Sequence, residues 1–397
     1  MTAASSTSEV PFSKVAPWVS IVGAMFLLTY LDRAMFGPLL QYFEQEYDIG
    51  HARSTSFLFY ISLGYSISLF LSGFTSAKVR PRIMVGGSAI GSGLVLVGIS
   101  FADDLRLFDV LFFTLGFAAG HYFNGGLSTM RSIVPPSQWS KAISIHEMGP
   151  NGSFIFGPIL AEVGAAYFGW RGVVLGMGIL SITAGFLFLM FARGGEAPSA
   201  KVPFRNLGKL LKEPKLWLFT WLMSLAIAGE FAPYSVLTLH LTNDRGFSPE
   251  ASAWLLTTSR IASPIAVLCG GWVTLRFGTM RTLAFCMVAY ALGMLLMAMP
   301  GNIPLFASMY TQPVLTAMIF PPVFTFLAES YTHSEQPMLL AVSMPIASLI
   351  GVGLMPPMLG LWGDYASFNA GFVMMGVLVA TSLPMLKFMG APTGKSG

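Results

Sequence analysis

The feature that most constrains this fold is a series of about twelve apolar runs, each near 20 residues long and set off by short polar breaks. An α-helix needs about 20 apolar residues to cross a hydrocarbon core about 30 Å thick. Only 10% of the 397 residues are charged, and 54% are hydrophobic. We therefore predict an all-α membrane protein with twelve transmembrane helices, at about 17–40, 54–77, 82–101, 107–130, 141–167, 171–192, 216–242, 250–275, 279–299, 304–328, 337–361 and 367–389.

The longest polar connection lies between the sixth and seventh runs, at residues 193–215. Six runs precede it and six follow it. We therefore predict an N-terminal six-helix bundle over 1–192, a cytoplasmic linker over 193–215 and a C-terminal six-helix bundle over 216–397.

An internal repeat supports two related halves, since transporters are often built by duplication. Gly73 and Gly271 open similar basic segments that close the second and eighth runs, at an offset of 198 residues. The same offset aligns further charged positions, Asp32 with Glu230 and Arg131 with Glu329. We interpret the halves as pseudo-symmetric.

The basic residues predict how the helices are oriented, because cytoplasmic loops retain Lys and Arg. With the N-terminus inside, sixteen of the 22 fall on the inner side and four on the outer side, and Arg33 and Arg260 remain in the membrane. The inner set is Lys14, Lys78, Arg80, Arg82, Arg131, Lys141, Arg193, Lys201, Arg205, Lys209, Lys212, Lys215, Arg276, Arg281, Lys387 and Lys395; the outer set is Arg53, Arg106, Arg171 and Arg245. We expect a multi-pass protein of the cell inner membrane with both termini cytoplasmic.

Composition also limits the classes of partner that the sequence indicates. The net charge of +4 is confined to short loops, so a nucleic-acid partner is not indicated. Cys269 and Cys286, the only cysteines, lie in apolar runs and suggest neither a disulfide framework nor a metal site. The sequence has no catalytic triad, phosphate-binding Lys loop or HExxH motif. We expect a monomer in the lipid bilayer that is not an enzyme and holds no cofactor.

Two arginines within apolar runs are the first functional candidates. An arginine in hydrocarbon costs roughly 2.5 to 3.5 kcal/mol on insertion scales, so such residues normally face a protein-lined or wet interior. Arg33 and Arg260 both fall roughly 10 to 15 Å below the predicted outer surface. Together they could clamp a carboxylate, sulfonate or phosphate. The alternative is structural ion pairing, of Arg33 with Glu230 or of Arg260 with Asp32.

Acidic and histidine side chains in the runs are candidates for proton coupling. Burial favours the protonated form of a carboxyl group and a neighbouring arginine favours the ionised form, so a proton switch is possible. We select Glu230 and Asp32 first, then Glu147 and His121. The alternatives are permanent salt bridges for the acids and core hydrogen bonding for the histidine.

Neutral polar residues at mid-depth complete the predicted substrate site, although each could equally bond a neighbouring helix. These are Tyr30, Tyr60, Asn124, Asn151, Tyr234, Tyr310 and Gln312. The proline pairs at 321–322 and 356–357 predict kinks in the tenth and eleventh helices.

The basic loops resemble the signature of the major facilitator superfamily, G-x-x-x-D-R-x-G-R-R/K. The second copy keeps three of its positions, at Gly271, Arg276 and Gly278, with the basic Arg281 one residue beyond the last position, whereas Ala77 and Leu275 stand where the family has aspartate. The sequence Gly169-Trp170-Arg171 and the Gly-Pro pairs at 149–150 and 157–158 are also similar to that family. The resemblance implies two six-helix bundles that rock around a central cavity.

Shorter matches refine this resemblance. The run Tyr30-Leu31-Asp32-Arg33 is similar to the first helix of anion:cation symporters, where the arginine faces organic anions. An arginine midway along helix eight, here Arg260, is similar to monocarboxylate porters. The arginine and glutamate that anion:cation symporters often carry in helix four are not evident here.

These observations lead to one functional prediction and two rivals. We predict a secondary active transporter that moves a small organic anion, with a carboxylate as the first choice, by proton-coupled symport and alternating access. The nearest rival is a proton-coupled efflux antiporter for drugs or metabolites, although two buried arginines disfavour cationic drugs. The other is a non-transporting receptor or assembly protein on the same fold.

Overall fold

The computed structural model describes residues 11–198, 207–332 and 335–389, and this part of the chain is helical without strands. The N-terminal helices are α1 (Phe12–Ala34), α2 (Phe36–Tyr47), α3 (His51–Thr75), α4 (Pro81–Ser100), α5 (Leu105–Arg131) and α6 (Trp139–Phe191). The C-terminal helices are α8 (Pro214–Leu239), α9 (Pro249–Arg260), α10 (Ser263–Phe277), α11 (Thr279–Ala298), α12 (Asn302–Ala317), α13 (Phe320–Ser330), α14 (Gln336–Ser348), α15 (Met355–Tyr365) and α16 (Phe368–Ser382). The short α7 (Leu207–Leu210) lies between the two sets, and the predicted linker residues Lys201 and Arg205, like Lys395, lie outside the described residues.

These helices account for the twelve predicted crossings. Ten segments of the described chain are long and apolar enough to cross a membrane. One of them, Lys141–Phe191, contains two crossings because Gly169 interrupts α6 with φ 69° and ψ 161°, a conformation open to glycine and costly for other residues. The 27-residue α5 adds the remaining crossing. The predicted all-α fold with twelve membrane helices is therefore confirmed.

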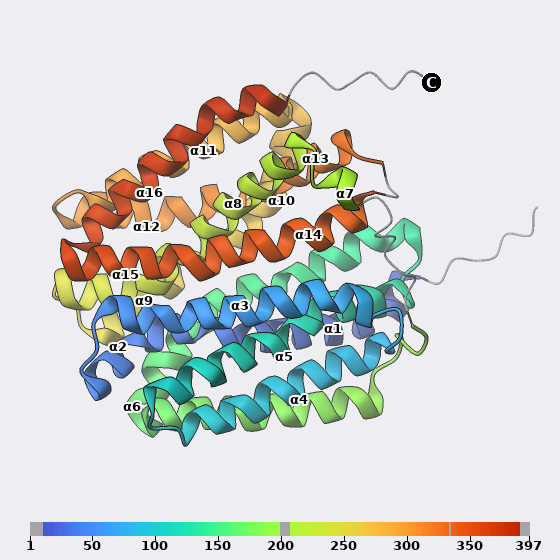
Figure 1. Ribbon diagram of the computed structural model, residues 1–397, viewed down its shortest axis with the longest axis horizontal. Coiled ribbons are helices and arrows are strands. Elements are labelled where there is room, and N and C mark those ends of the chain that lie inside the picture. The colour runs from blue at the N-terminus through green and yellow to red at the C-terminus, as the bar shows by residue number, and fades with distance from the viewer. Residues whose placement is uncertain (1–10, 199–206, 333–334, 390–397) are drawn as a thin grey trace, which may run out of the picture.

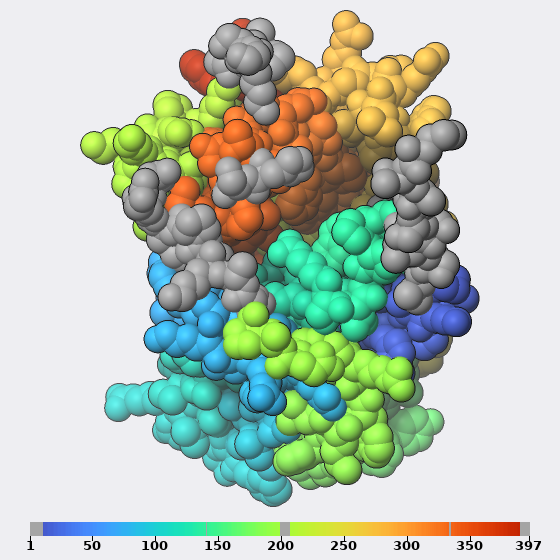
Figure 2. All heavy atoms as spheres, turned by 90° about the vertical axis from the view of Figure 1, so that its right-hand side faces the viewer, coloured from blue at the N-terminus to red at the C-terminus, as the bar shows by residue number. Residues whose placement is uncertain are grey.

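The two sets of helices form two layers. In Figure 1, α1–α6 fill the lower half and α8–α16 the upper half. We call the right-hand end of Figure 1, where α3, α5 and α10 end, the basic end, because Lys78 follows α3 and because Arg131 and Arg276 lie in the last turns of α5 and α10. The opposite end is the far end. Figure 2 looks onto the basic end and shows it hollowed between the orange C-terminal segments and the teal N-terminal segments.

The two halves meet closely at the far end. Gly37 of α2 lies so close to α8 that an added Cβ would come within 2.9 Å of the Ser235 Cα atom. Thr257 of α9 donates a hydrogen bond to the Ile155 carbonyl of α6, at 3.1 Å. The molecule is therefore closed toward the far end and hollowed at the basic end.

Several crossings are broken near their middle. The first crossing breaks at Met35, and the eighth breaks at residues 261–262, directly after Arg260. Pro38 and Pro264 explain these two breaks, since neither can donate the hydrogen bond that the carbonyl four residues earlier would accept. The predicted proline breaks are also present, as an interruption between α12 and α13 and a π-helical turn (Leu349–Leu354, η4) before α15.

Candidate functional site

Arg260 forms a closed ion pair inside the C-terminal half. It is the last residue of α9, where the partial negative charge of a helix C-terminus favours a cation. Its Nη1 donates to Glu230 Oε2 at 2.8 Å and its Nη2 to the Glu230 carbonyl at 3.0 Å. Thr316 of α12 donates to the other carboxylate oxygen at 2.7 Å. Arg260 is only 2% exposed, so this pair is held away from water.

Arg33 lies in the last turn of α1 in a different setting. Its guanidinium carbon is 4.2 Å from the centre of the Tyr65 ring and 5.0 Å from that of Tyr30, which is cation–π geometry. Its Nε donates to the Thr29 carbonyl at 3.2 Å. The side chain is only partly buried, and no carboxylate of the described chain lies within ion-pair distance of it.

Aromatic rings connect these two arginines. The ring of Phe154 on α6 lies 5.5 Å from that of Tyr30 and 4.8 Å from that of Tyr234, measured between ring centres. The Arg260 guanidinium carbon is 5.1 Å from the Phe154 ring and 5.4 Å from the Tyr234 ring. The Arg33 and Arg260 groups therefore lie at opposite ends of one aromatic cluster, which consists of Tyr65, Tyr30, Phe154 and Tyr234.

Asp32 faces away from this cluster. Its carboxylate accepts a hydrogen bond from Ser181 Oγ, which is 2.9 Å from both oxygens, and the residue has no exposed surface. Ser181 lies in the second crossing of α6, so this contact stays within the N-terminal half. Asp32 and Arg33 are therefore neighbours in sequence that point to different partners.

Two further predicted residues join the C-terminal end of the site. Gln312 is buried and donates to the Gly229 carbonyl at 2.6 Å, one residue before Glu230. Tyr234 is fully buried, and its hydroxyl has no hydrogen-bond partner in the described structure. The Nε of Arg260 also lacks one. The ion pair thus retains unused donors in a region that excludes water.

Three other predicted residues form hydrogen bonds outside the aromatic cluster. Asn124 donates to Ser72 at 2.6 Å, and Asn151 donates to a carbonyl of its own helix at 3.0 Å. Tyr310 is 43% exposed, and its hydroxyl lies 2.7 Å from Thr258 Oγ1. The contacts of Asn124 and Tyr310 are to neighbouring helices, and that of Asn151 is within α6.

The two weaker proton candidates occupy separate places. His121 lies 2.6 Å from Ser68 and lines a cavity of about 240 Å³ between α3, α4 and α5. The Glu147 side chain is 47% exposed and lies 3.1 Å from the buried His146 ring. The His121 contact lies apart from the aromatic cluster, whereas the His146 ring stacks on Phe26 with ring centres 4.3 Å apart, and Phe26 in turn lies 6.0 Å from the nearest ring of that cluster.

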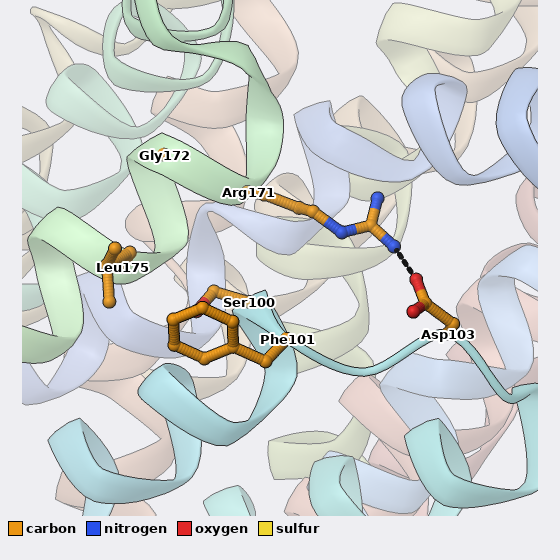
Figure 3. Close-up of a pocket in the computed structure, with 6 residues that line it drawn as sticks. All are labelled: Ser100, Phe101, Asp103, Arg171, Gly172 and Leu175. Atoms are coloured by element: carbon orange, nitrogen blue, oxygen red, sulfur yellow. Dashed lines mark hydrogen bonds and ion pairs between the residues drawn. The ribbon is translucent and has the colours of Figure 1, made fainter.

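A larger hollow lies at the far end, in the N-terminal half. Its volume is about 330 Å³, and Figure 3 shows the Arg171 side chain reaching from its wall toward Asp103. The Arg171 guanidinium also pairs with Glu46, whose carboxylate accepts from Trp170 Nε1 at 2.6 Å. Two carboxylates therefore neutralise Arg171, and it offers no free cation to a ligand. The Gly-Trp-Arg sequence instead links helix ends of the N-terminal half.

Sequence reasoning missed several residues of the site. Phe154 and Thr316 lie in apolar stretches where nothing marks them, and Tyr65 and Ser181 are common interior residues. A signal was available for Glu162, a third buried carboxylate, 5% exposed, that bonds Gln41 and Tyr42 of α2. It lies in an apolar run and was overlooked because no arginine accompanies it.

Twelve apolar crossings in two six-helix bundles, with buried charge inside each bundle, are typical of a polytopic membrane transport protein. The profile of the Major Facilitator Superfamily matches residues 22–239 and 222–397. The chain belongs to this superfamily, and the resemblance seen in its loops is confirmed.

Individual relatives are more distant. The chain is 24% identical over 277 residues to a glycerol-3-phosphate transporter of Bacillus subtilis, covering 62% of each protein. It is 26% identical over 271 residues to monocarboxylate transporter 13 of Rattus norvegicus, covering 64% of this chain and 60% of that protein. It is 27% identical over 257 residues to the multidrug resistance protein MdtG of Salmonella choleraesuis, covering 59% and 60%. The matches thus span about three-fifths of each relative.

A solved structure supports the same fold. A bacterial homologue of the human lysosomal transporter Spinster, in an inward-facing and occupied conformation, superposes with a TM-score of 0.80. The alignment covers 96% of this chain and 97% of the other at 14% identity. At that identity the likeness shows the fold alone.

Proposed function

We propose that this protein is a secondary active transporter that moves a small organic anion together with protons by alternating access. The observation that carries the proposal is the state of Arg33, a partly buried guanidinium framed by Tyr30 and Tyr65 without a carboxylate at ion-pair distance in the described chain. An intramembrane charge is costly and is usually retained for function. A forked guanidinium suits a carboxylate or phosphate, and adjacent rings suit an apolar body.

The names of two relatives are consistent with an anion. A glycerol-3-phosphate transporter and a monocarboxylate transporter are both named for organic anions, whereas MdtG is named for multidrug resistance. We favour a carboxylate, and we keep proton-coupled efflux of drugs or metabolites as the alternative.

The ion pair between Arg260 and Glu230 supplies the proposed coupling element. Protonation of Glu230 would remove the charge that holds Arg260 and let this guanidinium engage the anion through the aromatic cluster. Loss of the proton would restore the 2.8 Å pair and favour release. Asp32, bonded by Ser181 alone among the described side chains, is the second candidate for the proton.

We also propose that the basic end faces the cytoplasm, because basic residues concentrate at cytoplasmic ends of membrane helices. The hollow at this end and the closed far end would then make this an inward-facing state of an inner-membrane protein. The sequence halves 1–192 and 216–397 would be its rocking units, and a single chain would suffice.

Uptake into proteoliposomes tests the anion site. With an inward proton gradient, a panel of labelled carboxylates, organic phosphates and uncharged analogues should yield an accumulated anion. Arg33→Lys and Arg33→Gln should reduce its uptake at least tenfold, because loss of a charge-assisted hydrogen bond costs about 1.5 to 3 kcal/mol. The control is Arg106→Gln, which removes an exposed arginine. Parental uptake in both Arg33 variants would refute the proposal, and proton-driven extrusion of a drug would favour the alternative.

The pH dependence of uptake tests the coupling. Glu230→Gln should abolish the response of uptake to the proton gradient while anion exchange continues, since the amide cannot ionise. The response of uptake to the proton gradient should be measured in Asp32→Asn in the same way. An unchanged pH response in Glu230→Gln would move the proton site elsewhere.

A further inference from the structure

The far end holds a contact in which one half of the protein caps a helix of the other half. Asp364, in the last turn of α15, accepts hydrogen bonds from the backbone N–H groups of His51 and Ala52, each at 2.8 Å. These are the first two residues of α3. The residue at the N-cap position is Gly50, which has no side chain to offer these donors. The carboxylate therefore does the work of an N-cap from across the interface between the halves.

The helices below this contact approach very closely. A Cβ added to Gly360 would come within 2.6 Å of the His51 carbonyl oxygen and 2.3 Å of Thr55 Oγ1. Further along, Ser62 of α3 donates to the Ser348 carbonyl at 2.9 Å, and a Cβ on Gly353 would come within 3.0 Å of Ser62. The surface of α3 thus packs directly against the backbone of the eleventh crossing.

These observations fix what must break when the far end opens. Separating the two halves here would strip the carboxylate from α3 and leave two N–H groups at the positive end of the helix dipole without their acceptor. Other helix caps at this end need not break, because they lie within one half. Asp104 caps α5 through the N–H groups of Arg106 and Leu107, at 2.8 and 2.9 Å.

We propose that Asp364 is a conformational latch, whose capping of α3 from the opposite half stabilises the state closed at the far end. The cap stabilises only the state that is closed at the far end, because the capping carboxylate and the capped helix belong to different halves. The latch acts on the opening equilibrium and does not depend on which solute is carried.

Cysteine accessibility measures this equilibrium directly. Ser62 is 1% exposed and lies in the interface, so Ser62→Cys in a Cys269→Ser, Cys286→Ala background reports opening through its rate of alkylation by a charged maleimide. In the purified full chain in nanodiscs, Asp364→Ala should raise this rate about threefold to tenfold, the effect of losing one N-cap on an equilibrium. Asp104→Ala is the matched control and should leave the rate unchanged.

A second variant separates latching from local helix stability. Gly50 has the extended φ and ψ of an N-cap, so Gly50→Ser in the Asp364→Ala chain should cap α3 from within its own half. The latch requires that alkylation stays fast in this double variant. A return to the parental rate would mean that Asp364 acts only against helix fraying, and would overturn the proposal. An unchanged rate in Asp364→Ala would overturn it as well.

Discussion

The two arginines inside the membrane differ in what neutralises them. Arg260 is buried and bonded to Glu230 through side chain and backbone, whereas Arg33 is partly exposed and rests on the rings of Tyr30 and Tyr65. Tyr30 and Phe154 lie between the two groups. Under the proposed function, an incoming anion would meet an available cation at Arg33 and an already paired one at Arg260.

The internal repeat explains part of this difference. At the 198-residue offset Asp32 corresponds to Glu230, and both carboxylates are buried. The position that corresponds to Arg260 is Ser62, so the N-terminal acid has no arginine at the equivalent position. Arg33 follows Asp32 on the same helix but projects about 100° around it. The two halves therefore have a buried carboxylate at equivalent positions, but their arginines lie at positions that are not equivalent.

The largest expected effect is on stability and lies in the C-terminal half. Glu230→Leu should lower the free energy of unfolding by roughly 3 to 5 kcal/mol, because it leaves a buried guanidinium without its partner. Thermal unfolding in detergent would measure this. Glu147→Leu is the control and should change little, since that side chain is 47% exposed. Equal stabilities of the two variants would show that Arg260 does not depend on Glu230.

A smaller effect is expected at the acid of the N-terminal half. Ser181→Ala removes the hydroxyl that donates to Asp32, and a buried acceptor without its donor costs about 1 to 3 kcal/mol. The same unfolding assay applies, with Asp32→Asn in the Ser181→Ala chain as comparison. If Ser181→Ala is as stable as the parent, this carboxyl does not rely on the serine.

The smallest effect on stability should come from Arg33 itself. Arg33→Gln loses stacking on Tyr30 and Tyr65, worth about 0.5 to 1 kcal/mol at a partly exposed site. A loss as large as that of Glu230→Leu would show that Arg33 is a structural residue and would erase the contrast between the two arginines.

The fold followed from the sequence to a large degree, while the site followed only in part. Apolar runs of fixed length and the proline pairs in helices ten and eleven gave the crossings and two of the breaks, since both depend on local chemistry. The breaks near Met35 and Arg260 depend on the single prolines Pro38 and Pro264, which helices also tolerate. The partners of the charged residues depend on how helices rotate against one another, which sequence spacing does not determine.

Particular residues illustrate this limit. The sequence suggests an ion pair of Arg33 with Glu230 or of Arg260 with Asp32. In the structure, Arg260 pairs with Glu230 within one half. Asn124 and Tyr310 lie at the expected depth, yet they face Ser72 and Thr258. Phe154, which contacts both Tyr30 and Arg260, gives no signal in a run of apolar residues.

Anion affinity measured by equilibrium binding tests the central contrast most directly. The purified parent, Arg33→Gln and the neutral pair variant Glu230→Gln/Arg260→Gln would each be titrated with the labelled anion identified by uptake. At a pH high enough to keep Glu230 ionised and Arg260 paired with it, we expect Arg33→Gln to bind at least tenfold more weakly, and the pair variant, which loses opposite charges together, to stay within about threefold of the parent. Parental affinity in Arg33→Gln, with binding lost in the pair variant, would contradict the account.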